Sequence, residues 1–139
     1  MKKPFSTSLP RVVAVTLIVL LAFLLREIAV QNLPVDYDED DYLRAGQLYA
    51  NGIRQGDWGV FQRENYRTEH PPLSKILFGL AQLTVPPTAE IPDLPVTAEP
   101  NQTLPKSLLL ADRRVSSIAT TLEVLALAVI NPLAGFFLA

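Results

Sequence analysis

Two apolar stretches, separated by a long polar segment, dominate the sequence. The first runs from Val12 to Val30 and the second from Val115 to Ile130, each with few charged interruptions. A span needs about 20 mostly apolar residues to cross a hydrocarbon core of about 30 Å. The pattern therefore predicts transmembrane helices at 12–30 and 114–130, joined by a loop at 31–113.

Charged residues inside these stretches need an explanation. Arg26 lies near the end of the first stretch, where a long side chain reaches the lipid headgroups. Glu123 lies inside the second, where a carboxylate is costly in lipid and faces a protein interior or water. Its partner would be Arg26, a further helix or another subunit, unless Glu123 is protonated in place.

Asn131-Pro132 interrupts the end of the chain, and this pair favours a turn. Residues 131–139 are therefore predicted to start a third membrane segment. The alternative is one kinked span from Val115 to Ala139, which is long enough to cross with tilt.

The distribution of basic residues predicts the orientation. Three Lys or Arg residues precede the first stretch, and such a bias near the first helix usually sets topology. Residues 1–11 are then cytoplasmic and the loop at 31–113 is extracytoplasmic, in a multi-pass protein of the plasma membrane. Arg113 and Arg114, just before the second span, argue weakly the other way.

A basic start with an apolar core is also typical of a cleaved signal peptide, which would release a secreted protein. The residues after Leu25 offer no small-residue cleavage site, so an uncleaved span is preferred.

Two short helices are predicted in the loop. The first runs from Glu39 to Asn51, with Asp38 at or near its N-cap and Gly52 as its stop signal. The second begins at Pro71-Pro72 and carries an apolar stripe through Leu83. It is too short to span, which favours an interfacial helix resting on the membrane.

Residues 85–105 are rich in proline and lack aromatic residues. This composition predicts an extended, poorly ordered excursion rather than a packed module.

Composition agrees with an all-α integral membrane fold, since 49% of the residues are hydrophobic and the mean hydropathy is +0.23. The net charge of -2 argues against nucleic-acid binding. The sequence has no cysteine, which excludes disulfides, zinc-thiolate sites and a cysteine nucleophile.

The first candidate site is an acidic run from Asp38 to Asp41, directly after the first span. Crowded carboxylates push their pKa values apart, and a carboxylate with an adjustable pKa suits a general base for a hydroxyl acceptor. Composition alone favours a solvated acidic turn with a helix cap.

The second candidate site is the start of the Pro71-Pro72 helix. His70 precedes it and Lys75 lies in its first turns, so both side chains and the helix N-terminus suit a phosphate. Arg113 and Arg114, as paired guanidinium groups at the start of the second span, would also suit a lipid phosphate. Each has an ordinary structural interpretation, as a cap residue or an interfacial anchor.

Together these residues resemble the start of a polytopic GT-C glycosyltransferase, the superfamily of protein O-mannosyltransferases and lipid A aminoarabinose transferases. The resemblance covers most of residues 12–130 and rests on the order of its motifs. These are Asp38-Glu39 with Tyr42, then Glu69-His70-Pro71-Pro72-Leu73 with Lys75, then Arg114 opening the next span.

The resemblance implies a role for each candidate residue. Asp38 would deprotonate the acceptor hydroxyl as it attacks the anomeric carbon of a polyprenyl-phosphate sugar, with inversion. Glu39 would position donor, acceptor or a divalent cation. His70 and Lys75 would shape the donor site, and Arg114 would offset phosphate charge.

Members of the superfamily are several hundred residues long, with about a dozen spans. The resemblance therefore implies the N-terminal part of a larger enzyme or a split subunit, inactive alone. It explains neither residues 85–105 nor Glu123. The alternative is a small membrane-anchored interaction protein whose acidic outward loop binds a partner.

Overall fold

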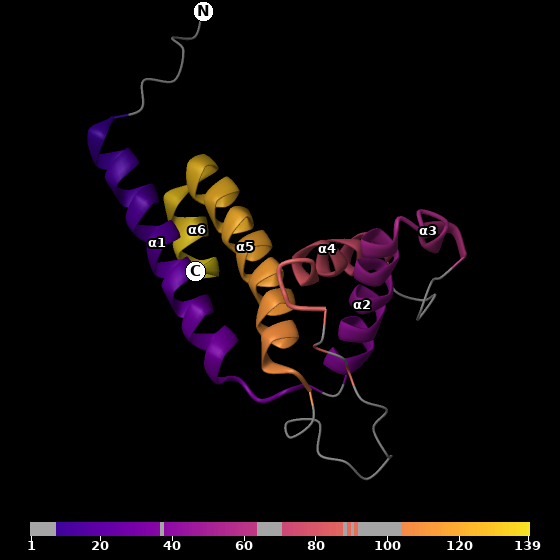
Figure 1. Cartoon of the computed structure of the whole chain (residues 1–139). Helices are drawn as coiled ribbons and strands as arrows, with labels where there is room; N and C mark the ends of the chain where they lie inside the picture. Colours follow the sequence, from indigo (N-terminus) through magenta and orange to yellow (C-terminus); the bar gives the residue numbers. More distant parts are fainter. Residues whose placement is uncertain (1–7, 37, 64–70, 88, 90, 92–103) are drawn as a thin grey trace, which may run out of the picture. The chain divides into compact units, whose positions relative to one another are not determined.

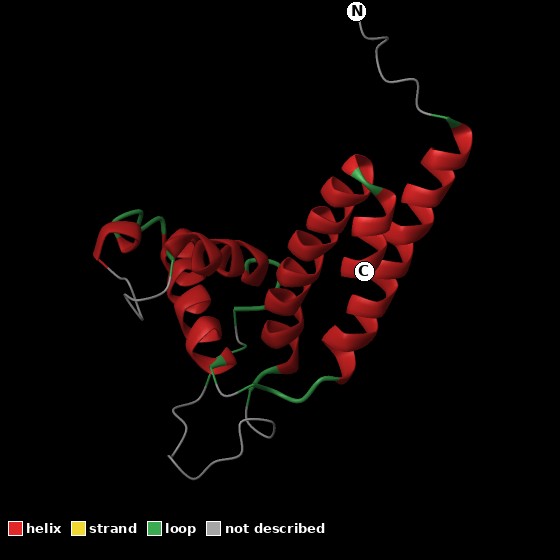
Figure 2. Cartoon of the chain, turned by 180° about the vertical axis from the view of Figure 1, so that it is seen from behind, coloured by secondary structure: helices red, strands yellow, loops and turns green. Residues whose placement is uncertain are grey.

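The computed structural model describes residues 8–36, 38–63, 71–87, 89, 91 and 104–139. All regular structure within these residues is helical (Figure 2), which confirms the predicted all-α class. The helices labelled in Figure 1 are, in chain order, α1 (Leu9–Asn32), α2 (Glu39–Gln55), α3 (Val60–Arg63), α4 (Pro72–Gln82), α5 (Lys106–Ile130) and α6 (Pro132–Leu138).

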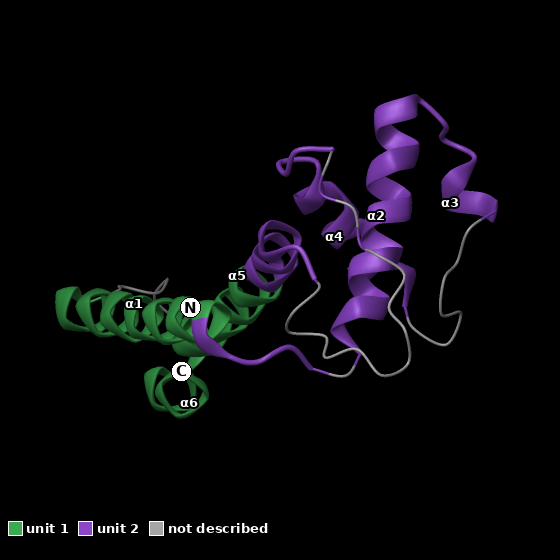
Figure 3. Ribbon diagram, turned by 60° about the horizontal axis from the view of Figure 1, so that its bottom comes forward, with its two compact units in different colours: residues 1–31, 116–139 green, residues 32–115 purple. Residues whose placement is uncertain are grey.

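The chain divides into two compact units (Figure 3). Unit 1 contains residues 1–31 and 116–139, and unit 2 contains residues 32–115. Helix α5 contributes its first turns to unit 2 and the rest to unit 1.

In unit 1, two arginines of α1 fix its direction relative to α5. Arg11 donates hydrogen bonds to the carbonyls of Val129 and Ile130, and Arg26 donates from Nε to Thr120 Oγ1 over 2.8 Å. The start of α1 therefore lies against the end of α5, so the two segments run antiparallel. Arg11 also places a cation at the C-terminus of α5, where carbonyls lack intrahelical partners.

Helix α5 ends where the Asn131-Pro132 break was predicted. The side chain of Asn131 caps α6 by accepting a hydrogen bond from the Leu133 amide, and proline occupies the first turn. Gly135 allows α6 to approach α5, because a Cβ there would lie 2.5 Å from Ala128 Cβ. Of the two alternatives for this segment, the structure has two helices rather than one kinked helix.

Unit 1 buries small side chains and exposes large ones. Its buried apolar residues include Ala22, Val124 and Ala128. The exposed large apolar residues of α1 are Leu9, Val12, Val13, Leu17, Leu20, Leu21, Phe23, Leu24, Leu25 and Ile28. Among the described helices, only α1 is long and apolar enough to cross a membrane by length and composition. The second predicted span, at 114–130, is not confirmed on that criterion.

In unit 2, helix α2 continues one turn beyond its predicted end. Gly52 does not stop the helix, because it is a packing position where a Cβ would lie 2.5 Å from Val60 Cγ1. The helix ends instead at Gly56, which adopts the left-handed conformation with φ of 72°.

Two glycines let α2 and α4 pack closely. A Cβ on Gly79 would lie 2.9 Å from the Gly46 carbonyl oxygen, and a Cβ on Gly46 would lie 2.6 Å from Gln82 Nε2. Helix α4 begins at the predicted proline pair and ends at Gln82, one residue before the predicted Leu83. Whether it rests on a membrane stays a prediction.

The core of unit 2 includes residues predicted to be unpacked. Val85 and Ile91 are buried with Leu43 and Leu108. The ends of the 85–105 segment that the structure describes are therefore packed against α2 and α5, and the rest of that segment lies outside the described residues.

Helix α5 begins at Lys106, eight residues before the predicted start at 114. Its first turns bury Leu108 in the core of unit 2. Polar residues just before the apolar stretch, which resembled a loop in the sequence, are therefore helical.

Candidate functional site

Asp38 is the N-cap residue of α2, as predicted, but its side chain makes no capping hydrogen bond. Its backbone lies near φ -111° and ψ -1°, and its carbonyl accepts from the Tyr42 amide. Among the described residues, the half-buried Asp38 carboxylate has no hydrogen-bond or ion-pair partner. Its oxygens are therefore available to a ligand.

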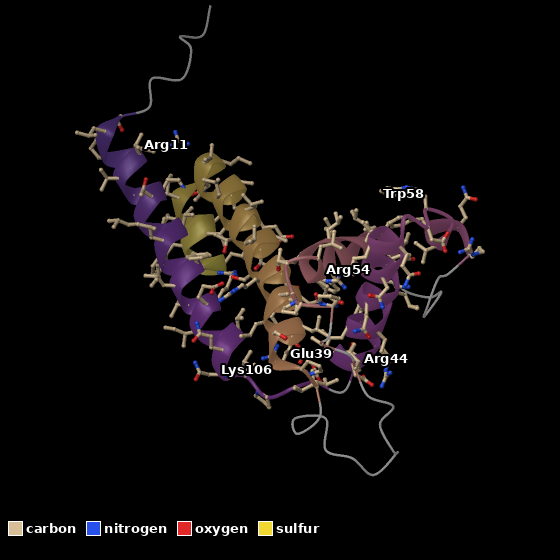
Figure 4. The ribbon with its side chains drawn as sticks, in the orientation of Figure 1. Arg11, Glu39, Arg44, Arg54, Trp58 and Lys106 are labelled. Atoms are coloured by element: carbon tan, nitrogen blue, oxygen red, sulfur yellow. The ribbon has the colours of Figure 1, made fainter. Side chains whose placement is uncertain are left out.

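The neighbouring Glu39 is firmly held. Arg113 of α5 donates from Nε to Glu39 Oε1 over 2.7 Å and from Nη2 to Oε2 over 2.6 Å. The same guanidinium donates to the carbonyls of Leu33 and Pro34. Hydrogen bonding to Glu39 raises the pKa of Arg113. Figure 4 labels Glu39 at the start of α2.

The ion pair with Arg113 limits the ligands that the Glu39 carboxylate can bind. Both carboxylate oxygens are engaged by Arg113, and Oε2 also accepts from the Asp36 amide over 2.9 Å. A cation at Glu39 would have to displace Arg113. No group of three or more His, Cys, Asp or Glu side chains suited to a metal occurs among the described residues.

A buried polar pair lies beside this ion pair, and the sequence analysis did not identify it. Gln82 of α4 donates from Nε2 to Asp112 Oδ2 over 2.8 Å and to the Leu43 carbonyl over 3.1 Å. Asp112 and Gln82 are both buried, and one oxygen of each has no partner among the described residues. The sequence offered one indication that Asp112 is buried: it lies four residues after the buried Leu108, and residues at that spacing share one face of a helix.

Burial raises the pKa of Asp112 to about 7, with a smaller upward contribution from the Glu39 charge, whereas the Gln82 hydrogen bond lowers it. A protonated Asp112 also adds an O-H donor to this site, where the unpartnered oxygens of Asp112 and Gln82 are otherwise both acceptors. Asp112 is therefore a group that changes protonation near neutral pH, within the same unit as Asp38.

The other predicted site residues have different surroundings. Lys75 is fully buried in α4, and Arg114 is exposed on α5 next to Arg113. His70 lies outside the described residues. The structure places Asp38, Glu39, Lys75 and Arg114 in unit 2 and brings Glu39 together with Arg113. No hydrogen bond or ion pair among the described residues joins Asp38 to Lys75 or Arg114.

Glu123, in unit 1, is exposed on α5. Arg26 was one predicted partner, but it instead binds Thr120 and the carbonyls of Ala22, Leu138 and Ala139. Among the described residues, no hydrogen bond or ion pair involves the Glu123 carboxylate.

Comparisons with known proteins identify no relative: no family model matches the chain, and neither does any curated protein or solved structure.

Proposed function

We propose that the chain is the N-terminal part of a membrane glycosyltransferase that moves a sugar from a polyprenyl-phosphate donor to a hydroxyl acceptor on the extracytoplasmic side. The observation that carries the proposal is the contrast within the Asp38-Glu39 pair. Glu39 is bound by Arg113, whereas the Asp38 carboxylate at the start of α2 has no hydrogen-bond or ion-pair partner in the part of the chain that the structure describes.

The proposed reaction uses Asp38 as a general base. Its carboxylate accepts the proton of the acceptor hydroxyl while the hydroxyl oxygen forms a bond to the anomeric carbon. The bond from that carbon to the phosphate oxygen breaks, and polyprenyl phosphate leaves with the electron pair. Attack opposite the leaving group inverts the anomeric configuration.

Positive groups of unit 2 would offset the phosphate charge. In this proposal Arg114, which is exposed, binds the phosphate directly. Lys75 and His70 shape the donor end through α4. Glu39 acts indirectly, because its bond to Arg113 connects the start of α2 to α5 and thereby positions Asp38.

The membrane part of the proposal is supported by unit 1, which exposes large apolar side chains and buries small ones. A water-soluble helical unit buries its large apolar residues, but α1 exposes leucines and valines along its length. Small buried residues such as Ala22, Ala128 and Gly135 are typical of helix contacts in lipid. We propose that α1 and the later part of α5 span the plasma membrane, with residues 31–113 outside.

The test is sugar transfer in membranes of cells that express the intact gene, assayed with labelled polyprenyl-phosphate sugars. Asp38→Asn is expected to lower the transfer rate by about 10² to 10⁴, the usual contribution of a general base. Asp40→Asn is the matched control, because it removes the same charge two residues away and should retain transfer. An Asp38→Asn variant with the wild-type rate would exclude the catalytic assignment.

A second candidate, a membrane-anchored interaction protein, is favoured by Glu123. An exposed carboxylate among apolar side chains is expected to face a partner helix that donates a hydrogen bond. Glu123→Gln retains hydrogen bonding but loses charge. If this second function holds, Glu123→Leu releases a co-purifying partner, whereas Asp38→Asn has no effect on any activity.

A further inference from the structure

The only tryptophan of the chain is held at the surface of unit 2 by the turn that follows α2. Trp58 is 67% exposed, although tryptophan carries a large apolar ring. Figure 4 labels it beside α3, at the edge of this unit. We call residues 57–63 the Trp58 turn.

Short-range contacts close the Trp58 turn. Asp57 Oδ1 accepts from the Gly59 amide over 3.1 Å, and its Oδ2 pairs with Arg63. The Arg63 guanidinium also lies close to Gly59, since a Cβ there would be 2.3 Å from Arg63 Nη1. Val60 is buried against Gly52 and ties the turn to α2. Trp58 is thus displayed by a closed turn rather than by a loose loop.

A series of aromatic rings connects Trp58 to helix α2 through Phe61. Tyr49 is buried in α2 and stacks on Phe61, with ring centroids 5.1 Å apart and planes 6° from parallel. Trp58 stacks on Phe61 at 6.3 Å and 21°. The indole therefore lies beside Phe61 with the two rings nearly parallel, and the exposed fraction of the indole leaves surface for a ligand.

The polar groups around the ring define the ligand class. Asp57 and Arg63 are both largely exposed, with 45% and 60% of their side chains accessible, so lone pairs and N-H groups remain free for a ligand. A sugar ring has a flat face of C-H groups and an edge of hydroxyls. The face matches an indole, and the hydroxyls match a carboxylate and a guanidinium side by side.

We propose that Trp58, Asp57 and Arg63 form a binding surface for a sugar ring. A lipid surface is a poorer match, because an exposed carboxylate beside the ring opposes insertion among headgroups, and the ion pair leaves no net positive charge to attract them. The surface goes beyond the proposed transfer reaction, since it requires neither Asp38 nor a phosphate.

The test uses Trp58 as its own reporter, because no other tryptophan contributes fluorescence. The full chain, in a zwitterionic detergent that carries no sugar, is titrated with methyl glycosides and with a linear oligosaccharide. We expect a saturable change in emission with a Kd on the order of 1 mM, typical of a small ligand on an open surface. No change up to about 50 mM, where such a site would be saturated, would overturn the proposal.

Variants separate this surface from the proposed active site. Arg63→Ala should weaken sugar binding at least about fivefold through lost charge-assisted hydrogen bonds, whereas Gln55→Ala, outside the turn, should not. Asp38→Asn should bind sugar like the wild type. A wild type that binds sugar but does not transfer it would count against the proposed function alone, and a wild type that transfers sugar without binding it at this surface would count against the Trp58 surface alone.

A second measurement tests the lipid alternative. In vesicles that contain brominated phosphatidylcholine, Trp58 fluorescence should remain unquenched. Strong quenching by the brominated lipid would overturn the proposal, because the ring would then be inserted in the bilayer.

Discussion

The two units of this chain treat apolar side chains in opposite ways. Unit 2 collects Leu43, Val85, Ile91 and Leu108 into a buried cluster, as a water-soluble domain does. Unit 1 buries small residues and leaves the leucines of α1 exposed. All regular structure in the described residues of both units is helical, yet the two units differ in which apolar side chains they bury.

Arginines bind backbone carbonyls in both units, as Arg11 and Arg26 do in unit 1 and as Arg54 and Arg113 do in unit 2. Unit 2 also contains two side-chain pairs that engage carboxylates, Glu39 with Arg113 and Asp112 with Gln82. Helix ends need satisfied carbonyls wherever water is scarce, whereas side-chain pairs fix the relation between helices. The candidate chemistry lies in the second kind of network.

The largest expected difference comes from adding one charge to each unit. Leu20→Lys, near the middle of α1, should weaken membrane insertion by about 3 kcal/mol, which is on the order of 100-fold. Leu48→Lys, at an exposed position of α2, should have no effect on insertion. The measurement is the fraction of protein that resists alkaline extraction from membranes. Equal fractions for the two variants would break the contrast between the units.

The next effect tests the buried pair of unit 2. The pKa of Asp112 is about 7 in the folded state against 3.8 when exposed, so the folded state holds a proton that the unfolded state has lost between these values. Stability is thus highest below the unfolded pKa and falls as pH rises toward 7. From pH 5 to pH 8 this group should lower the free energy of unfolding by about 2 to 3 kcal/mol.

Asp112→Asn should remove this pH dependence. The amide mimics the protonated acid, because it is uncharged and adds an N-H donor to this buried site. Urea unfolding of both proteins in detergent, followed by Trp58 fluorescence at pH 5 and pH 8, measures the difference. A wild type that is more stable at pH 8, relative to the variant, would contradict the assignment.

The smallest effect concerns the ion pair that orders Asp38. Arg113→Ala should lower the free energy of unfolding of unit 2 by about 1 to 2 kcal/mol, because Glu39 is partly buried and loses its partner. Arg114→Ala should cost less, since its side chain is exposed. Thermal unfolding of the two variants, measured side by side, checks this order. A larger loss for Arg114→Ala would reverse our assignment of the two arginines.

Periodicity and turn chemistry predicted most of the helices. The N-cap at Asp38, the start of α4 at the proline pair and the break at Asn131 all depend on residues next to one another in the chain. Local preferences of this kind are visible in a sequence. The predicted stop at Gly52 was wrong because a glycine that allows close packing cannot be distinguished from a cap by its identity alone.

The polar network of unit 2 could not be predicted from local sequence patterns, because its paired residues lie far apart in the chain. Arg113 pairs with a residue 74 positions away, and Asp112 pairs with one 30 positions away. Neither spacing follows from local periodicity. The sequence drew attention to Arg114, the exposed neighbour, and only the fold distinguishes it from Arg113, which holds Glu39.

The central proposal, that α1 and the later part of α5 span the membrane while residues 31–113 lie outside it, is tested most directly by thiol labelling. The chain has no cysteine, so single substitutions report without background. We expect Gln55→Cys in unit 2 to react with a membrane-impermeant maleimide in intact cells, and Leu20→Cys in α1 to remain unlabelled. Labelling of Gln55→Cys only after cell lysis, or ready labelling of Leu20→Cys in intact cells, would contradict the account.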